Sequence, residues 1–435
     1  MLYLRSNFTQ NNTSMKKTYR ILLAGFAALA VFSCNKDVTP AAPMSAEEVQ
    51  KKLSDVAVAT IEEVDPINYK EWGQSAIKLY NAIQTIGRNS KDFDVDFDMM
   101  LKSSTEKKEG FEITTNIIQL SLLKGDVTVK DDQFVYTESD KPFNMTIPAD
   151  GKTYKIQVES AGENGDGIII AQSTRENGDV TYIRKNGIVV PQKAAIHITE
   201  DGKQFMDIEV YPVIDDKNKN GILDEPDVIT GQASVVIPAY SLLLNDLKIT
   251  YDSAIGTLAL MHGKTSVLSV NAQVDLMEVV SSVKALNEGV KEMGEIMPKT
   301  IKGSISLMGG QAIVKADMDA EKVMGVSMHY AAEDKAKEAC KLYNANVKAD
   351  LYFDNNPTIQ ASLVFLVEKA DTDEESWNVV PGLHFYDGVS ADMTFDEFVT
   401  SFTSNEEAIG PVMDAAGGFM GKIALYFPEL MPKKK

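Results

Sequence analysis

Two spacings of apolar residues divide this chain into regions. Between residues 45 and 90 apolar side chains recur every three or four positions, which predicts an N-terminal helical segment broken at Asp65-Pro66. Between residues 91 and 274 the period changes to two, and turn pairs recur at short intervals, which predicts an antiparallel β-rich region. Residues 275–432 mix both periods. The pattern therefore predicts an α+β fold, a β-rich antiparallel meander with packed helices.

The helical segment has clear start signals. Ser45-Ala46-Glu47-Glu48 forms a capping box, so a helix is expected to begin there, and a second one is expected from about Tyr69 to Gly87. In the β-rich region, Asn and Asp followed by Gly favour tight hairpin turns. The turn pairs are Asp150-Gly151, Asn164-Gly165, Asn177-Gly178, Asn186-Gly187 and Asp201-Gly202.

The last region opens with a regular apolar stripe from Leu276 to Met297, which predicts a helix that packs on a sheet face. The later pattern predicts strands at Ile301–Val314, Val323–Tyr330, Val347–Phe353 and Ile359–Val367, a helix at about Glu333–Asn344, and a last helical region capped by Thr394 and Glu397. No Pro/Gly/Ser-rich linker of useful length interrupts residues 45–432, so we expect one tightly joined unit.

The first 34 residues carry an export signal. A basic stretch from Met15 to Arg20 precedes a twelve-residue apolar run, Ile21–Phe32, which is too short to span a bilayer core of about 30 Å. This run ends in Ser33-Cys34. With Val31 and Ser33 before the cysteine, the segment resembles the lipobox of bacterial lipoproteins, from which Phe32 departs. Translation is expected to begin at Met15, because residues 1–14 fit no signal peptide.

The resemblance implies that residues 1–33 are removed, that the thiol of Cys34 is diacylated and that its amine is then acylated, with chains such as palmitate. Two or more such chains hold a protein durably on a membrane. Residues 34–44 would then be a lipidated tether. The segment Val31–Asp37 is similar to lipoproteins of the Bacteroidetes, which implies a lipid-anchored position at the outer membrane, on either its surface or its periplasmic side.

The net negative charge of the chain argues against nucleic acid as a partner. A chain that begins at Cys34 has 39 basic and 63 acidic residues, a formal net charge of −24, which repels nucleic acid. With Cys34 acylated, Cys340 is the remaining cysteine, so no disulfide can form within the chain. Cys340 lies on the apolar side of a predicted helix and is interpreted as a small buried hydrophobe.

One loop has the residue order of a calcium site. In the segment from Asp216 to Asp227, oxygen-bearing side chains occupy positions 1, 3, 5, 9 and 12, and Gly221 occupies position 6. It resembles EF-hand loops, and especially those of dockerins because position 12 is Asp. The expected side-chain ligands are Asp216, Asn218, Asn220, Asp224 and Asp227, with the carbonyl of Ile222. The flanking sequences predict strands, so the alternative is an Asx-rich turn between two strands.

Other candidate sites are weaker. Alternation in Asp92–Met99 places four carboxylates on one strand face, which indicates a solvated strand or a cation- or glycan-facing patch. Asp252-Ser253-Ala254 matches the short O-glycosylation sequon of Bacteroidetes lipoproteins, with Ser253 as acceptor, or a plain turn. His197, His262, His329 and His384 are scattered, and neither HExxH nor a GxSxG elbow is present.

Three classes of function fit these features. The first is a non-enzymatic envelope lipoprotein, with a structural calcium loop, that binds a glycan or an envelope protein or has a structural role. The second is a carrier of an apolar ligand in a cavity between sheet and helix, since 19 Met and long alternating strands suit a cavity wall as well as a dry core. The third is a glycoside hydrolase-like enzyme, because its two carboxylates need no fixed spacing in sequence. No catalytic residue is predicted.

Overall fold

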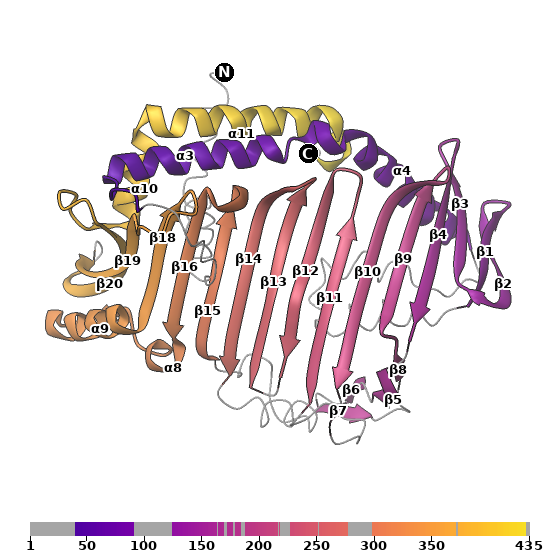
Figure 1. The fold of residues 1–435 in the computed structure, drawn as a ribbon, viewed down its shortest axis with the longest axis horizontal. Coiled ribbons are helices and arrows are strands. Elements are labelled where there is room, and N and C mark those ends of the chain that lie inside the picture. The colour runs from indigo at the N-terminus through magenta and orange to yellow at the C-terminus, as the bar shows by residue number, and fades with distance from the viewer. Residues whose placement is uncertain are drawn as a thin grey trace.

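The protein is built on one very long β-sheet with its longest helices along one end of its strands (Figure 1). The computed structural model describes residues 40–90, 124–162, 164–168, 172–176, 179–183, 188–215, 217, 227–250, 252–276, 298–370 and 373–431. In these residues the fold is α+β and mainly β, as the apolar pattern predicts.

Among the described residues the main sheet contains 17 strands, which pair antiparallel except that β1 pairs in parallel with β3. Neighbours run in the order β2, β1, β3, β4, β9 to β16, β18, β19 and β20, and β20 also pairs with β17 and β21. The strands are β1 (Lys124–Lys130), β2 (Gln133–Pro142), β3 (Asn144–Ala149), β4 (Lys152–Ala161), β9 (Lys193–Glu200), β10 (Lys203–Asp215), β11 (Val228–Val236), β12 (Tyr240–Ile249), β13 (Ser253–His262), β14 (Thr265–Leu276), β15 (Pro298–Leu307), β16 (Ala312–Asp319), β17 (His329–Tyr330), β18 (Val347–Phe353), β19 (Ala361–Ala370), β20 (Asp373–Phe385) and β21 (Met393–Thr394).

Two short two-stranded sheets stand apart from the main sheet. They pair β5 (Asn164–Ile168) with β8 (Ile188–Val190), and β6 (Gln172–Glu176) with β7 (Asp179–Ile183). Glu176 lies opposite Asp179 in the second of these, and the predicted turn at Asn177-Gly178 between them lies outside the described residues. Asn164-Gly165 lies inside β5 instead, so the prediction of a turn there is wrong. Asn186-Gly187 lies outside the described residues.

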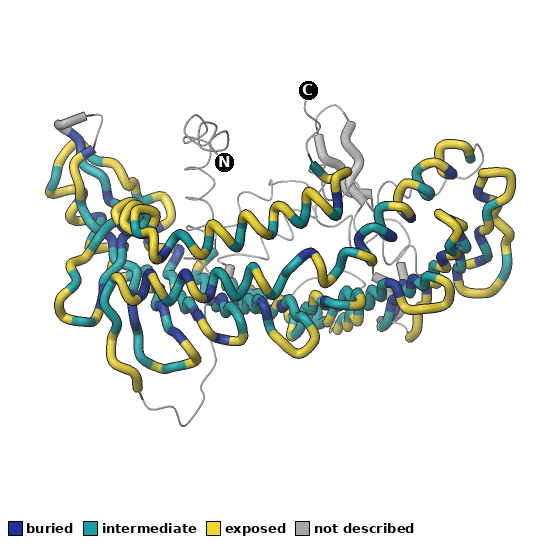
Figure 2. Tube along the Cα trace, turned by 90° about the horizontal axis from the view of Figure 1, so that it is seen from above, coloured by how far each residue is buried: buried dark blue, intermediate teal, exposed yellow. Residues whose placement is uncertain are grey.

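The helices are α3 (Ala46–Glu63), α4 (Lys70–Asn89), α8 (Ala320–Val323), α9 (Glu333–Asn346), α10 (Phe395–Ser404) and α11 (Glu406–Tyr426), with 3-10 turns η1 (Pro66–Tyr69), η3 (Met308–Gly310) and η4 (Pro428–Leu430). Both predicted capping boxes are confirmed: Ser45 caps α3 with Glu48, and Thr394 caps α10 with Glu397. Figure 2 shows α3 and α11 side by side, with α3 nearer the sheet.

The last region departs from its prediction in three places. The apolar run Ile301–Val314 is two strands, β15 and β16, because Gly309 and Gly310 adopt positive φ and turn the chain. The run Val323–Tyr330 is not a strand; it contains the end of α8 and the two-residue β17. α11 was not separated from the capped helix at Thr394, because Pro411 and four glycines interrupt its pattern. Residues 277–297, with their predicted helix, lie outside the described residues.

The sheet has one apolar and one polar face, since paired residues of neighbouring strands project to the same side. One row of paired positions crosses ten strands and is apolar throughout: Val158, Ile196, Ile208, Val235, Leu242, Leu260, Leu268, Leu307, Ala312 and Phe353. We call this side the apolar face. A row on the opposite side contains Thr257, Asn271, Ser304, Lys315, Asp350, Ser362 and His384, and we call that side the polar face.

The apolar face is buried at both ends of the sheet. At one end α4 packs on it, with Leu79 and Ile86 against Val127, Met145 and Ile147. At the other end α3 supplies Val49 and Val56 to a cluster with Phe353 and Phe385, and α9 supplies Ala336 and Tyr343 to a cluster with Phe365. The sheet is continuous from β14 to β15, so strand pairing joins the predicted regions 91–274 and 275–432.

Candidate functional site

Of the predicted calcium loop, the structure describes Lys217 and Asp227. Asp215 of β10 pairs with Val228 of β11, so the predicted loop lies between two antiparallel strands, as the strand patterns on both sides predict. Asp227 is 5% exposed, and its Oδ1 accepts a 2.9 Å hydrogen bond from the backbone N–H of Lys217. Asp216, Asn218, Asn220, Ile222 and Asp224 lie outside the described residues. Among the residues that the structure does describe, no group of three or more His, Cys, Asp or Glu could hold a metal.

Of the other predicted sites, some lie within the described residues and some lie outside them. Cys34 and the acidic segment Asp92–Met99 lie outside the described residues. Ser253 is the first residue of β13, and its Oγ lies 2.8 Å from Oγ1 of Thr250, so its hydroxyl belongs to the turn that starts the strand. Cys340 lies on α9, as predicted, and its Sγ donates to the carbonyl of Phe365 at 3.0 Å. Burial raises the pKa of this thiol, which makes it less reactive.

The four histidines lie apart, and each has a polar partner. Nδ1 lies 2.8 Å from Asp207 in His197, 2.8 Å from Glu63 in His262, 2.8 Å from Asn378 in His329 and 2.7 Å from Asp392 in His384. His262 contacts the end of α3, and its ring stacks on that of Tyr240 with centroids 4.7 Å apart. These pairs tie strands and helices together and do not form a common site.

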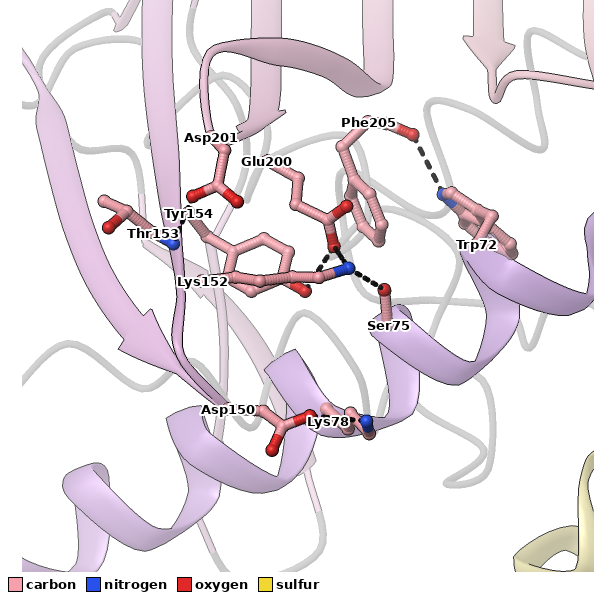
Figure 3. Close-up of polar contacts among 10 residues, drawn as sticks. All are labelled: Trp72, Ser75, Lys78, Asp150, Lys152, Thr153, Tyr154, Glu200, Asp201 and Phe205. Atoms are coloured by element: carbon pink, nitrogen blue, oxygen red, sulfur yellow. Dashed lines mark hydrogen bonds and ion pairs between the residues drawn. The ribbon is translucent and has the colours of Figure 1, made fainter.

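A polar cluster that the sequence does not reveal lies where α4 crosses the sheet (Figure 3). Tyr154 is 1% exposed, and its hydroxyl donates a 2.6 Å hydrogen bond to Oε1 of Glu200. Nζ of Lys152 lies 2.9 Å from the same oxygen and 3.1 Å from Oγ of Ser75 on α4. Nearby, Nε1 of Trp72 donates to the carbonyl of Phe205 at 2.9 Å.

Burial and hydrogen bonds shift the pKa values of Tyr154 and Glu200 in this cluster. Burial, followed by the hydrogen bond to Glu200, raises the pKa of Tyr154 to about 12. Burial opposes ionisation of Glu200, but the hydrogen bonds from Tyr154 and Lys152 outweigh it and lower the pKa of the carboxyl. Nζ of Lys152 contacts both the carboxylate of Glu200 on the sheet and the hydroxyl of Ser75 on α4. The cluster therefore attaches α4 to the sheet.

The central strands present a different surface. The three apolar clusters of the described residues include no residue of β11, β12, β13 or β14. On the apolar face of these strands Leu242, Leu258 and Ile249 are 42%, 40% and 38% exposed. Leu242 and Leu258 lie on adjacent strands, because Leu242 pairs with Leu260 and Leu244 pairs with Leu258. Large aliphatic side chains are therefore accessible together in the middle of the sheet.

A strip of small residues crosses this part of the apolar face. Paired positions on five neighbouring strands are Gly256, Ala272, Gly303, Ala316 and Ala349. The paired rows on either side contain larger residues, except for Ala254: one row is Leu258, Val270, Ile305, Val314 and Leu351, and the other is Ala254, Val274, Ile301, Met318 and Val347. At a strand spacing of about 4.8 Å the strip is about 19 Å long. Gly303 and Ala349 are buried, whereas the strip begins on β13 beside the exposed Leu258.

A cluster with aromatic residues lies on the polar face at β16 to β20. The hydroxyl of Tyr386 lies 2.9 Å from Oγ of Ser362, and its ring meets that of His384 edge-on at 4.7 Å. Tyr386 is 43% exposed. Burial, with the charge of Asp350, raises the pKa of Tyr352 to about 12. Nζ of Lys315 lies 4.6 Å from the centre of the Tyr352 ring.

Comparison with known proteins adds no relative: no family model, no curated protein and no solved structure matches this chain. Within the described residues, no helix is both long and apolar enough to cross a membrane.

Proposed function

We propose that this protein is a lipid-anchored, non-enzymatic envelope protein that carries an apolar ligand, of the acyl-chain class, on the apolar face of its central strands. The observation that carries the proposal is the strip of small residues between two aliphatic rows, open beside the exposed Leu258. An acyl chain needs a long surface of apolar contacts and few hydrogen-bonding groups.

The composition of the central face supports this class of ligand. On β11 to β15 the polar side chains of the apolar face are Tyr240, His262 and Thr265, at the end of the strands that meets the helices. The remaining positions are Gly, Ala, Val, Ile, Leu or Pro. Complete burial of a Leu or Ile side chain gains about 1.5–3 kcal/mol relative to exposure, so a ligand that covers the exposed leucines is stabilised by the surface it removes from water.

Displacement of a fluorescent fatty acid tests the carrier function. Ala272→Leu places a larger side chain in the strip, and we expect it to weaken binding of the probe about tenfold, since about 1.4 kcal/mol of lost contact corresponds to that factor. Gln273→Leu, at the next residue on the polar face, is the matched control and should bind as the parent does. Leu258→Asp changes the exposed end of the strip without filling it, and it should also weaken binding. Saturable binding that neither Ala272→Leu nor Leu258→Asp affects would place the ligand elsewhere.

Glycan binding is the second candidate. The polar-face cluster combines the exposed ring of Tyr386 with the hydroxyl of Ser362 and the carboxylate of Asp350, which accepts from Ser362 at 2.5 Å. Aromatic rings and carboxylates are the groups that stack on sugars and bind their hydroxyls. A glycan array that shows binding by the parent and loss in Tyr386→Ala, with fatty acid binding absent, would favour this candidate over the carrier.

Two further properties belong to the proposal. We infer that Cys34 carries the acyl anchor, from its resemblance to a lipobox, and that the loop Asp216–Asp227 binds calcium as a structural clip. Cys34→Ala should release a soluble or uncleaved protein from the membrane fraction. A Cys34→Ala variant that stays in that fraction with a normal mature mass would exclude the anchor.

A further inference from the structure

Helix α11 presents an outer face that lacks the charges of an ordinary surface helix. Its inward side includes the buried Ala408, whereas Met413, Met420 and Leu425 are 48%, 52% and 71% exposed, and Leu430 in the following turn is 66% exposed. From residue 408 to residue 426 the exposed positions include one charged residue, Asp414. An exposed apolar surface along a helix marks an interaction site.

Four glycines extend this face. Gly410, Gly417, Gly418 and Gly421 lie in α11, and a Cβ added at any of them would meet no atom within 4 Å. Glycine within a helix costs about 1 kcal/mol relative to alanine. Packing within the described part of the chain therefore does not require these glycines. Together with the methionines they make a smooth apolar face.

α11 is held firmly from its inner side. Lys422 forms an ion pair with Asp65, and Nε2 of Gln74 donates to the carbonyl of Tyr426 at 3.1 Å. Phe427 stacks on Tyr69 and approaches Gly73 so closely that a Cβ there would lie 2.6 Å from its ring. The helix thus keeps a fixed orientation, with its apolar side outward.

The start of the described chain lies in the same helical layer. The backbone N–H groups of Ala41 and Met44 donate to side chains of Asn356 and Gln360, at 3.1 and 2.7 Å, and α3 then runs beside α11 (Figures 1 and 2). Six residues lie between Cys34 and Ala41, and the seven steps from Cα to Cα reach at most about 25 Å. An acyl anchor at Cys34 would therefore hold the helical layer near the bilayer surface.

From these observations we propose that the outer face of α11 docks on the membrane surface, with Met413, Met420, Leu425 and Leu430 in the interfacial region, so that the apolar sheet lies on the far side of the helices. This inference rests on the proposed acylation of Cys34. The anchor supplies a high local concentration, so a face too weakly apolar to bind alone suffices for docking. Because the mature chain carries a net charge of −24, a zwitterionic surface suits it better than an anionic one.

Depth-dependent quenching tests the proposal on the acylated full-length mature protein. The chain has two tryptophans, Trp72 near β10 and Trp377 on β20, so Leu425→Trp adds a distinguishable emitter on α11. The vesicles are phosphatidylethanolamine with phosphatidylcholine brominated on its acyl chains. We expect most of the added emission of Leu425→Trp to be quenched. The matched control is Leu342→Trp on α9, where Leu342 is 36% exposed, and it should keep its emission.

Three outcomes overturn the inference. Full emission of Leu425→Trp in acylated protein would show that α11 faces water although the acyl anchor is present. Equal quenching of Leu425→Trp and Leu342→Trp would show that the bilayer does not select this face. A blue shift of Leu425→Trp without brominated lipid, accompanied by a cross-linked dimer, would show that a second copy covers α11. An intact mass without acyl chains on Cys34 would instead refute the proposed anchorage on which the inference rests.

Discussion

Tyr154 and Glu200 face each other across the strand pair β4 and β9, and the tyrosine hydroxyl donates a 2.6 Å hydrogen bond to Oε1 of the carboxylate. The same oxygen lies 2.9 Å from Nζ of Lys152, which also reaches Ser75 of α4. The carboxylate thereby connects the sheet to the helix that covers one end of it. Loss of either donor, Tyr154 or Lys152, leaves the partly buried carboxylate of Glu200 with fewer hydrogen bonds, which lowers the stability of the folded state.

Tyr154→Phe should destabilise the protein by about 1.5–3 kcal/mol, because the variant loses a hydrogen bond to a charged group within a packed cluster. Urea denaturation followed by circular dichroism measures this change. Tyr80→Phe, at a tyrosine of α4 that is 44% exposed, is the matched control and should change stability little. Equal midpoints for Tyr154→Phe and the parent would show that the hydrogen bond contributes nothing net.

The alkaline limit of stability should depend on Tyr154. Its pKa is raised to about 12 from an ordinary value near 10, so its contribution is complete below pH 10 and is lost as the pH rises toward 12. We expect the melting temperature of the parent to fall more steeply over this range than that of Tyr154→Phe. Parallel curves for the two proteins would contradict the assigned shift.

The acid limit should depend on Glu200. Since its pKa is lowered in the folded state, its stabilising contribution is present above the unfolded value near 4.5 and is lost as the pH falls through the folded value. Glu200→Gln should therefore flatten the decline in stability below about pH 4.5. Glu71→Gln, on the exposed side of α4, is the control and should retain the decline. Thermal melts between pH 7 and pH 3 provide the comparison.

Calcium should raise the melting temperature. The loop has two neutral amides among its first three ligands and a short Asp at position 12, so we expect a Kd of about 10⁻⁴ to 10⁻³ M. At ten times Kd, binding to the folded state alone adds about 1.4 kcal/mol. Asp216→Ala should abolish the effect, and Glu225→Ala, an acid of the same loop outside the ligand set, should retain it. Magnesium should do less, because its rigid octahedral geometry suits the loop poorly. Identical melts in calcium and chelator, with no heat of binding, would support the Asx-rich turn.

Limited proteolysis should first remove residues before Ala41, because the hydrogen bonds of Ala41 and Met44 protect the chain after that point. A second cut is expected at residues 371–375, where the chain passes from β19 to β20. Fragments cut between residues 277 and 297 should stay associated, since β14 and β15 pair across that interval. Release of two separate folded halves on a native gel would contradict a single unit.

Local sequence patterns were sufficient to predict helix caps, turns and strands whose formation depends on neighbouring residues. Ser45 with Glu48 and Thr394 with Glu397 form the expected capping boxes, and Asp201-Gly202 turns β9 into β10 with positive φ at both residues. Alternation identified the strands on both sides of residues 216–227 because one side of each strand is apolar. α11 was missed because its glycines and Pro411 weaken a helical pattern that its contacts with α3 and Phe427 compensate.

The sequence by itself determined the fold class, the alternation of apolar and polar residues and the segments that suggest an anchor and a calcium loop, because each depends on residues close together in the chain. Only the tertiary structure decided which distant residues meet. The register aligns Gly256, Ala272 and Gly303 into one strip, and the packing of α4 brings Ser75 to Lys152 and Glu200. Strand order and register arise from cooperative burial of the whole apolar face, and no local stretch of sequence contains that information.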